Sequence, residues 1–242
     1  MAALDIALRF WARAFPDALA RRVLPDGATI FEASVQETQL VQVERRLDRL
    51  FLVDSDAGRF LLHAEFDRMH AGLGQRVAEY QHLVHASQSG VPSPLGVTST
   101  VVLVDGPRRL RLGAREHRLS PTWAAMSTAG YLALPVYTQT LDELACWGHP
   151  AWLAFAPLTR GVTTDTIRQA LHRIRQSGMS VRDQAATIEI MLIVARVRRP
   201  NRGFEEVIMQ EQQTQESPWD LLSDTWLAQH WLQKGRESGE PC

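Results

Sequence analysis

A strand–turn–strand pattern in the first third of the chain constrains the fold most. Residues 46–53 (RLDRLFLV) and 59–66 (RFLLHAEF) are mainly apolar and suited to strands, and the segment between them, 54–58 (DSDAG), is typical of a tight turn. The pattern predicts an antiparallel hairpin. A hairpin of this kind must bury one face against further strands or helices.

The turn also predicts the register of the hairpin. If it is centred between Asp56 and Ala57, Asp48 lies opposite Glu65. Because side chains alternate along a strand, Asp67 is expected on the same face as Glu65. A shift of one residue in this register would separate the two acids and leave both as solvated charges at the strand edge.

Carboxylates that face each other across adjacent strands repel and destabilise a sheet. A hard divalent cation, usually Mg²⁺, would offset that repulsion by taking oxygen ligands from both. His63 shares the face of Glu65 and is either a further ligand or base, or a side chain that hydrogen-bonds a neighbour. His82 and His85 have a spacing that allows metal binding on a helix, but no third ligand accompanies them, and solvation is the simpler interpretation.

The surrounding pattern predicts a mixed α/β core. Apolar spacing favours a helix over 4–24 that is broken near Pro16. The remaining expected elements are strands over 29–43 and 97–104, a helix over 75–88, and a short strand within 131–138. The apolar run VTSTVVLV at 97–104 suits an interior strand that is covered on both faces.

Beyond about residue 140 the pattern changes to helices. Three are expected to begin after a Thr164 cap, after a Ser180 cap and at Phe204, and Ser217-Pro218 opens a last one. This last helix places Trp219, Leu222 and Trp226 on one side. A large apolar face on a terminal helix predicts packing against the body of the chain or a second copy, so the C-terminal helices are the expected homo-oligomer contact.

Composition excludes several classes of mechanism. Of 26 basic residues only Lys234 is a lysine, so the body of the chain lacks a phosphate-loop lysine and a Schiff-base lysine. The two cysteines, Cys146 and Cys242, form neither a disulfide framework nor a CxxC metal site. The sequence contains no signal peptide and no apolar run that could span a membrane, so we expect a cytoplasmic protein without membrane partners. A net charge of −1 argues against a basic surface that clamps nucleic acid all round.

The ordered set ERRLDRLFLV (44–53), LLHAEF (61–66) and QRVAEY (75–80) resembles the PD-(D/E)XK nuclease superfamily, and within it the recombination-promoting nuclease (Rpn) branch of transposase-like proteins. The resemblance covers about residues 1–160. It implies a restriction-endonuclease-like mixed sheet flanked by helices over 1–160, followed by an α-helical C-terminal region over 161–242.

The resemblance also implies roles for individual residues. Asp48 matches the first metal-binding acid and Glu65 the second. Asp67 occupies the position usually held by lysine, or by glutamine in this branch, which is a departure from the pattern. Asp67 is either a further ligand for the metal or the mark of a chain that kept the fold and lost the reaction. Arg76 lies on the following helix, which packs beside the site in the family, and is expected to hold a phosphate; the alternative is an ion pair with Glu79 or Asp67.

Three functions therefore remain open. The first is a DNA endonuclease that hydrolyses phosphodiester bonds with Mg²⁺ or Mn²⁺ and uses Asp48, Glu65, Asp67 and Arg76. The second is a catalytically degenerate nuclease fold that acts as a DNA-binding or protein-interaction module. The third is an oligomerising helical adaptor whose function resides in residues 160–235.

Overall fold

The computed structural model describes residues 2–36, 49–88, 94–107, 130–200 and 202–213. The chain divides into two compact units, each considered by itself. One contains the described residues of 15–139 together with 146–149, and the other contains residues up to 14, residues 140–145 and the described residues from 150 onwards. The division into 1–160 and 161–242 stays a prediction.

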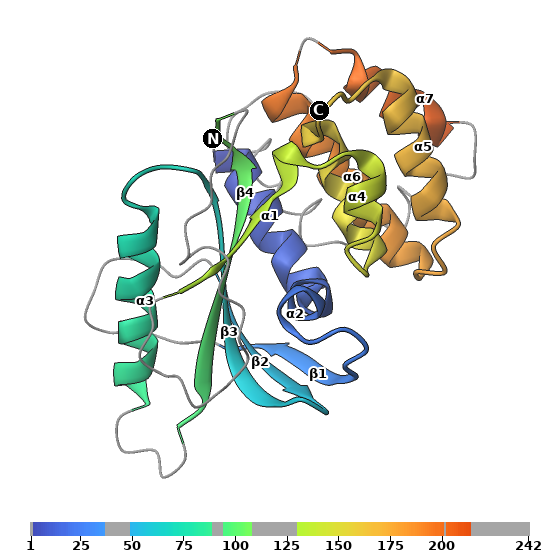
Figure 1. Ribbon diagram of the computed structural model, residues 1–242. Helices are drawn as coiled ribbons and strands as arrows, with labels where there is room; N and C mark the ends of the chain where they lie inside the picture. The colour runs from blue at the N-terminus through green and yellow to red at the C-terminus, as the bar shows by residue number, and fades with distance from the viewer. Residues whose placement is uncertain (1, 37–48, 89–93, 108–129, 201, 214–242) are drawn as a thin grey trace, which may run out of the picture. The chain divides into compact units, whose positions relative to one another are not determined.

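A five-stranded mixed sheet forms the centre of the first unit (Figure 1). Its strands lie side by side in chain order: β1 (Ile30–Val35), β2 (Arg49–Ser55), β3 (Gly58–Arg68), β4 (Gly96–Asp105) and β5 (Leu132–Pro135). The β1–β2 and β2–β3 pairs are antiparallel, whereas β3–β4 and β4–β5 are parallel. The expected mixed α/β architecture is confirmed.

The β2–β3 hairpin has the predicted register. Ser55 pairs with Gly58 across the turn, and the pairing continues without a shift to Arg49 and Ala64. Gly58 has a φ of 120°, a conformation that costs little only for glycine. The described part of the hairpin therefore confirms a turn centred between Asp56 and Ala57.

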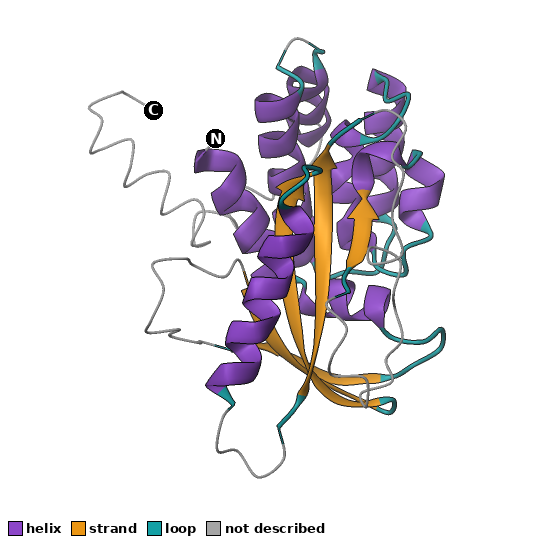
Figure 2. Cartoon of the chain, turned by 60° about the vertical axis from the view of Figure 1, so that its left-hand side comes forward, coloured by secondary structure: helices purple, strands orange, loops and turns teal. Residues whose placement is uncertain are grey.

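Helix α3 (Leu73–Ser87) covers one face of this sheet, and the short α2 (Pro16–Val23) lies on the other (Figures 1 and 2). Leu73 and Val77 of α3 pack with Val101 and Leu103 of β4 in one apolar cluster. Since a parallel connection from β3 to β4 needs a crossover, α3 is also the segment that joins the two strands. The strand expected at 97–104 is the interior strand β4, as predicted.

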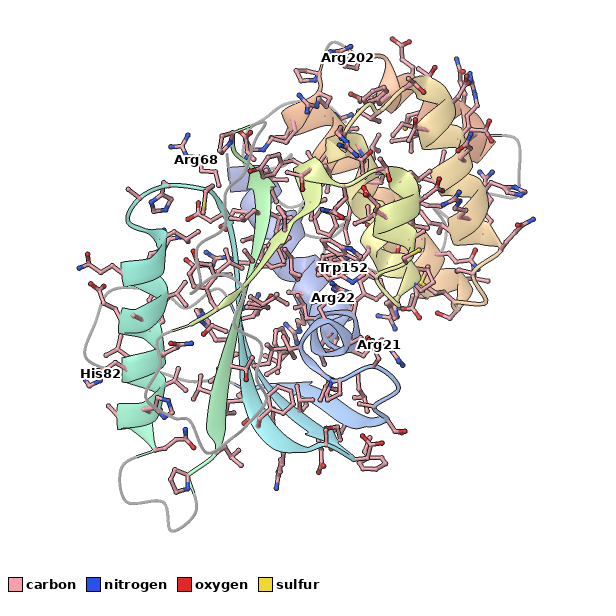
Figure 3. The ribbon with its side chains drawn as sticks, in the orientation of Figure 1. Arg21, Arg22, Arg68, His82, Trp152 and Arg202 are labelled. Atoms are coloured by element: carbon pink, nitrogen blue, oxygen red, sulfur yellow. The ribbon has the colours of Figure 1, made fainter. Side chains whose placement is uncertain are left out.

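The second unit is helical. It begins with α1 (Ala2–Ala14), α4 (Leu141–Ala145) and a 3₁₀ segment, η2 (Pro150–Leu158). The helices α5 (Thr164–Arg175), α6 (Val181–Arg198) and α7 (Phe204–Gln213) follow in the chain. Trp11 of α1 donates its indole N–H to the carbonyl of Ala151 at 3.0 Å and packs against Trp152, which Figure 3 labels. The helix expected over 4–24 is thus two helices, and Pro16 opens the second.

Several expected boundaries change. The strand expected over 29–43 is β1, which ends at Val35; this residue pairs with Phe51 of β2. Residues 37–48 lie outside the described residues. The short strand expected within 131–138 is β5 followed by a 3₁₀ turn, η1 (Val136–Thr138). Thr163, not Thr164, caps α5, because its hydroxyl accepts from the N–H of Thr166 and the Thr166 hydroxyl accepts from the N–H of Thr163.

Other predictions fall outside the part of the chain that the structure describes. They include the last helix with Trp219, Leu222 and Trp226, and with it the expected oligomer contact.

Ser180 caps α6 as predicted. Among the described residues, the longest apolar helix still falls short of what a membrane crossing requires.

Candidate functional site

Three residues of β3 point towards α3. His63, Glu65 and Asp67 alternate along the strand, and the first two are buried, with 0 % and 4 % of their surface exposed. Their register partners on β4 are Ser99, Val101 and Leu103, the last two of which pack directly under α3. The expectation that His63, Glu65 and Asp67 share one face is confirmed by this arrangement.

Arg76 joins the two carboxylates. It lies in the first turn of α3, and its Nη2 is 2.7 Å from Glu65 Oε1. The same nitrogen donates to Asp67 Oδ2. Burial tends to lower the pKa of Arg76, but the charges of Glu65 and Asp67 outweigh burial and raise that pKa above its ordinary value. Arg76 is therefore a fixed positive charge between two acids.

Asp67 is held by three donors. Besides Arg76, its Oδ1 accepts from the backbone N–H of Arg68 at 2.7 Å, and its Oδ2 lies 3.0 Å from His70 Nε2. A lysine at this position would repel Arg76, so an aspartate fits these surroundings better. The ion pair between Arg76 and Asp67 was one of the two alternatives for Arg76; the contact with Glu65 and the participation of His70 were not expected.

A second polar network lies next to these acids. His63 Nδ1 is 3.1 Å from Ser99 Oγ, and Gln81 of α3 donates to that oxygen at 2.9 Å and to the carbonyl of Gly130 at the same distance. Burial, and secondly the charge of Arg76, lowers the pKa of His63 to about 4, so the imidazole is neutral at ordinary pH. The interpretation of His63 as a side chain that hydrogen-bonds a neighbour is confirmed. Its other ring nitrogen, Nε2, is buried and has no hydrogen-bond partner among the described residues.

Tyr80 completes the buried face of α3. Its ring meets the imidazole of His63 edge-on, with centroids 5.4 Å apart. Arg76 and Tyr80 share the face of α3 that looks onto the sheet, as their spacing predicts. His82 points away from the sheet on the outer side of α3 and is exposed (Figure 3), as the solvated interpretation expects.

The first acid of the expected site, Asp48, lies outside the described residues. Arg49, its chain neighbour, pairs with Ala64. The described residues supply two carboxylates on one face, Glu65 and Asp67, and these are the hard oxygen donors that Mg²⁺ or Mn²⁺ prefers. No group of three or more His, Cys, Asp or Glu side chains within the described ranges is arranged to hold a metal ion. The carboxylate oxygens of Glu65 and Asp67 are of the type that such an ion binds, and Asp48 is the expected third ligand.

The comparisons with known proteins leave the family open: no family model, no curated protein and no solved structure matches the chain.

Proposed function

We propose that the protein is a divalent-metal-dependent endonuclease that hydrolyses phosphodiester bonds in DNA. The proposal is supported by one observation above all: a buried glutamate and a second acid lie on one face of an interior strand and share one arginine. A buried carboxylate with a second carboxylate beside it is unusual unless a cation lies close to both. The mixed sheet flanked by helices agrees with the restriction-endonuclease-like core that the sequence resemblance implies.

In this proposal Asp48, Glu65 and Asp67 hold Mg²⁺ or Mn²⁺. When bound, such an ion lowers the pKa of a water molecule and neutralises charge that develops on the phosphate. The carboxylates orient the ion, and Arg76 supplies a fork of N–H donors that suits a phosphate oxygen. Neutral His63, anchored to Ser99, keeps β3 and α3 in a fixed relation around these groups.

A second candidate is the degenerate nuclease fold that binds DNA or a protein without cleaving. The observation in its favour is the same arginine: Arg76 already pairs with both Glu65 and Asp67, so each acid has a positively charged partner without a metal. Asp67 in place of the usual lysine or glutamine points the same way.

A nicking assay separates these candidates. Supercoiled plasmid is incubated with the protein in Mg²⁺, in Mn²⁺ and in EDTA, beside the variants Asp48→Ala and Glu65→Gln. Glu79→Gln, which removes a carboxylate from α3, is the matched control. The endonuclease predicts metal-dependent nicking that both site variants abolish and the control keeps. Plasmid that is bound in a mobility-shift assay but never nicked would favour the degenerate fold.

A further inference from the structure

We propose that Arg76 is a resident cation that a divalent metal must displace from Glu65 and Asp67 before it binds. The inference rests on the proposed function, because it assumes that these acids are metal ligands. It adds a regulation of the site: in the metal-free protein both acids are paired with Arg76.

The geometry supports a single shared position. One nitrogen, Arg76 Nη2, contacts both Glu65 Oε1 and Asp67 Oδ2. Because the two acids are two residues apart on one strand, their side chains converge on the same side of the sheet. A metal ion that binds Glu65 Oε1 and Asp67 Oδ2 together must therefore take the place in which this nitrogen now lies.

Burial explains why some cation has to be there. Glu65 is only 4 % exposed, and an ionised carboxylate that is buried without a charge partner is costly. Arg76 meets that need in the absence of metal. Arg76 lies near the start of α3, and 33 % of its side chain is exposed to solvent. The side chain can therefore move outwards when a metal ion arrives.

Competition follows from these contacts. Oxygens that accept from a guanidinium are less available to a metal, and a guanidinium and a divalent ion repel each other. The measured affinity for the metal is then the intrinsic affinity multiplied by the fraction of protein in which Arg76 has left the site. Removing the guanidinium while keeping the length of the side chain should raise metal affinity.

The test uses isothermal titration of Mn²⁺ into three full-length proteins: the parent, Arg76→Met and Arg68→Met. Arg68 adjoins Asp67 in the chain and is exposed, so its removal controls for the loss of one positive charge near the site (Figure 3). We expect Arg76→Met to bind Mn²⁺ about tenfold more tightly than the parent and Arg68→Met to remain within about twofold. Equal or weaker binding by Arg76→Met would overturn the inference.

Thermal unfolding gives a second readout that does not depend on cleavage. In EDTA, Arg76→Met should melt below the parent because two acids lose their cation, and Mn²⁺ should raise its melting temperature more than it raises that of the parent. Arg76→Gln, which removes the positive charge but keeps a polar side chain with N–H donors, serves if the methionine variant does not fold. It should bind Mn²⁺ more tightly than the parent, and parent-like or weaker binding overturns the inference.

The outcomes also separate this inference from the proposed function. If none of the proteins binds Mn²⁺, both are wrong. If Mn²⁺ binds and supports nicking but the affinity is the same with and without the Arg76 guanidinium, only displacement is wrong.

Discussion

The imidazole Nδ1 of His63 lies 3.1 Å from the hydroxyl of Ser99, its register partner on the adjacent parallel strand. Gln81 donates to the same hydroxyl from α3. This small network joins β3, β4 and α3 beneath the helix that carries Arg76. Its integrity should therefore matter for stability as well as for the site.

Ser99→Ala should lower the free energy of unfolding by about 1–3 kcal/mol. The change removes the shared hydroxyl and leaves His63 and Gln81 short of a buried hydrogen bond, a loss that no water can easily replace. Urea denaturation measures it. Ser87→Ala, which removes a hydroxyl bonded to the Val84 carbonyl near the end of α3, is the matched control and should cost less. Equal losses in the two variants would show that the network adds nothing.

Gly106→Ala should destabilise the sheet unit by about 1–3 kcal/mol. A Cβ at position 106 would lie 2.3 Å from the hydroxyl oxygen of Tyr137 and 2.8 Å from the ring carbon that bears it. Either the tyrosine or the backbone after β4 must then shift. The melting temperature of Gly106→Ala should fall. The same change should cost much less when it is made in a Tyr137→Ala background and compared with Tyr137→Ala alone, because the clash is then absent.

Gly74→Ala is the control for that prediction. Gly74 lies in the first turn of α3, and a Cβ there would meet the Tyr131 ring at 3.7 Å, an ordinary contact. Alanine also favours a helix over glycine, so the melting temperature should stay equal or rise slightly. A fall as large as that of Gly106→Ala would mean that space around the glycine is not the cause.

Asp67→Lys should destabilise the protein, although lysine is the usual residue at the matching position of the nucleases that the sequence resembles. It would replace a carboxylate that Arg76 and His70 contact with a second cation beside Arg76. We expect a loss of about 1–2 kcal/mol in urea denaturation and a smaller one for Asp67→Asn, which removes the charge without reversing it. A lysine variant as stable as the parent would show that Arg76 moves away from position 67 without cost. If the lysine variant nicks plasmid faster than the parent, the parent is better described as a degenerate nuclease fold.

The hairpin could be predicted because local signals fix it. The turn residues set its centre, and the period of two along β3 then places His63, Glu65 and Asp67 on one face whatever the rest of the chain does. The break at Pro16 and the cap at Ser180 are equally local. At 163–164 two threonines compete for the cap, and only the reciprocal bond to Thr166 decides between them.

The contacts of the site could not be predicted in the same way. Arg76 is far enough from Glu65 along the chain that their meeting depends on how α3 lies across β3, and sequence periodicity does not give that angle. Ser99 and Gln81 carried no signal because a serine in an apolar strand and a glutamine on a helix are common. His70 offered only its spacing of three residues from Asp67.

A last prediction concerns the helical unit. Glu189 lies in the middle of α6, is only 6 % exposed, and leaves its Oε2 without a hydrogen-bond partner among the described residues. Burial raises the pKa of this carboxyl to about 7. The folded protein thus keeps a proton that the unfolded chain has released, and stability should fall as pH rises from about 4.5 to 7, by roughly 3 kcal/mol in all.

Glu189→Gln should remove this dependence, because glutamine has the same shape and does not titrate. Urea denaturation at pH 8 should find Glu189→Gln clearly more stable than the parent, whereas at pH 5, where the parent carboxyl is already neutral, the two should agree within about 1 kcal/mol. Glu206→Gln, at an exposed position of α7, is the control and should leave stability nearly unchanged at both pH values. If Glu189→Gln is no more stable than the parent at pH 8, the buried carboxyl is stabilised as an anion and does not favour the neutral form.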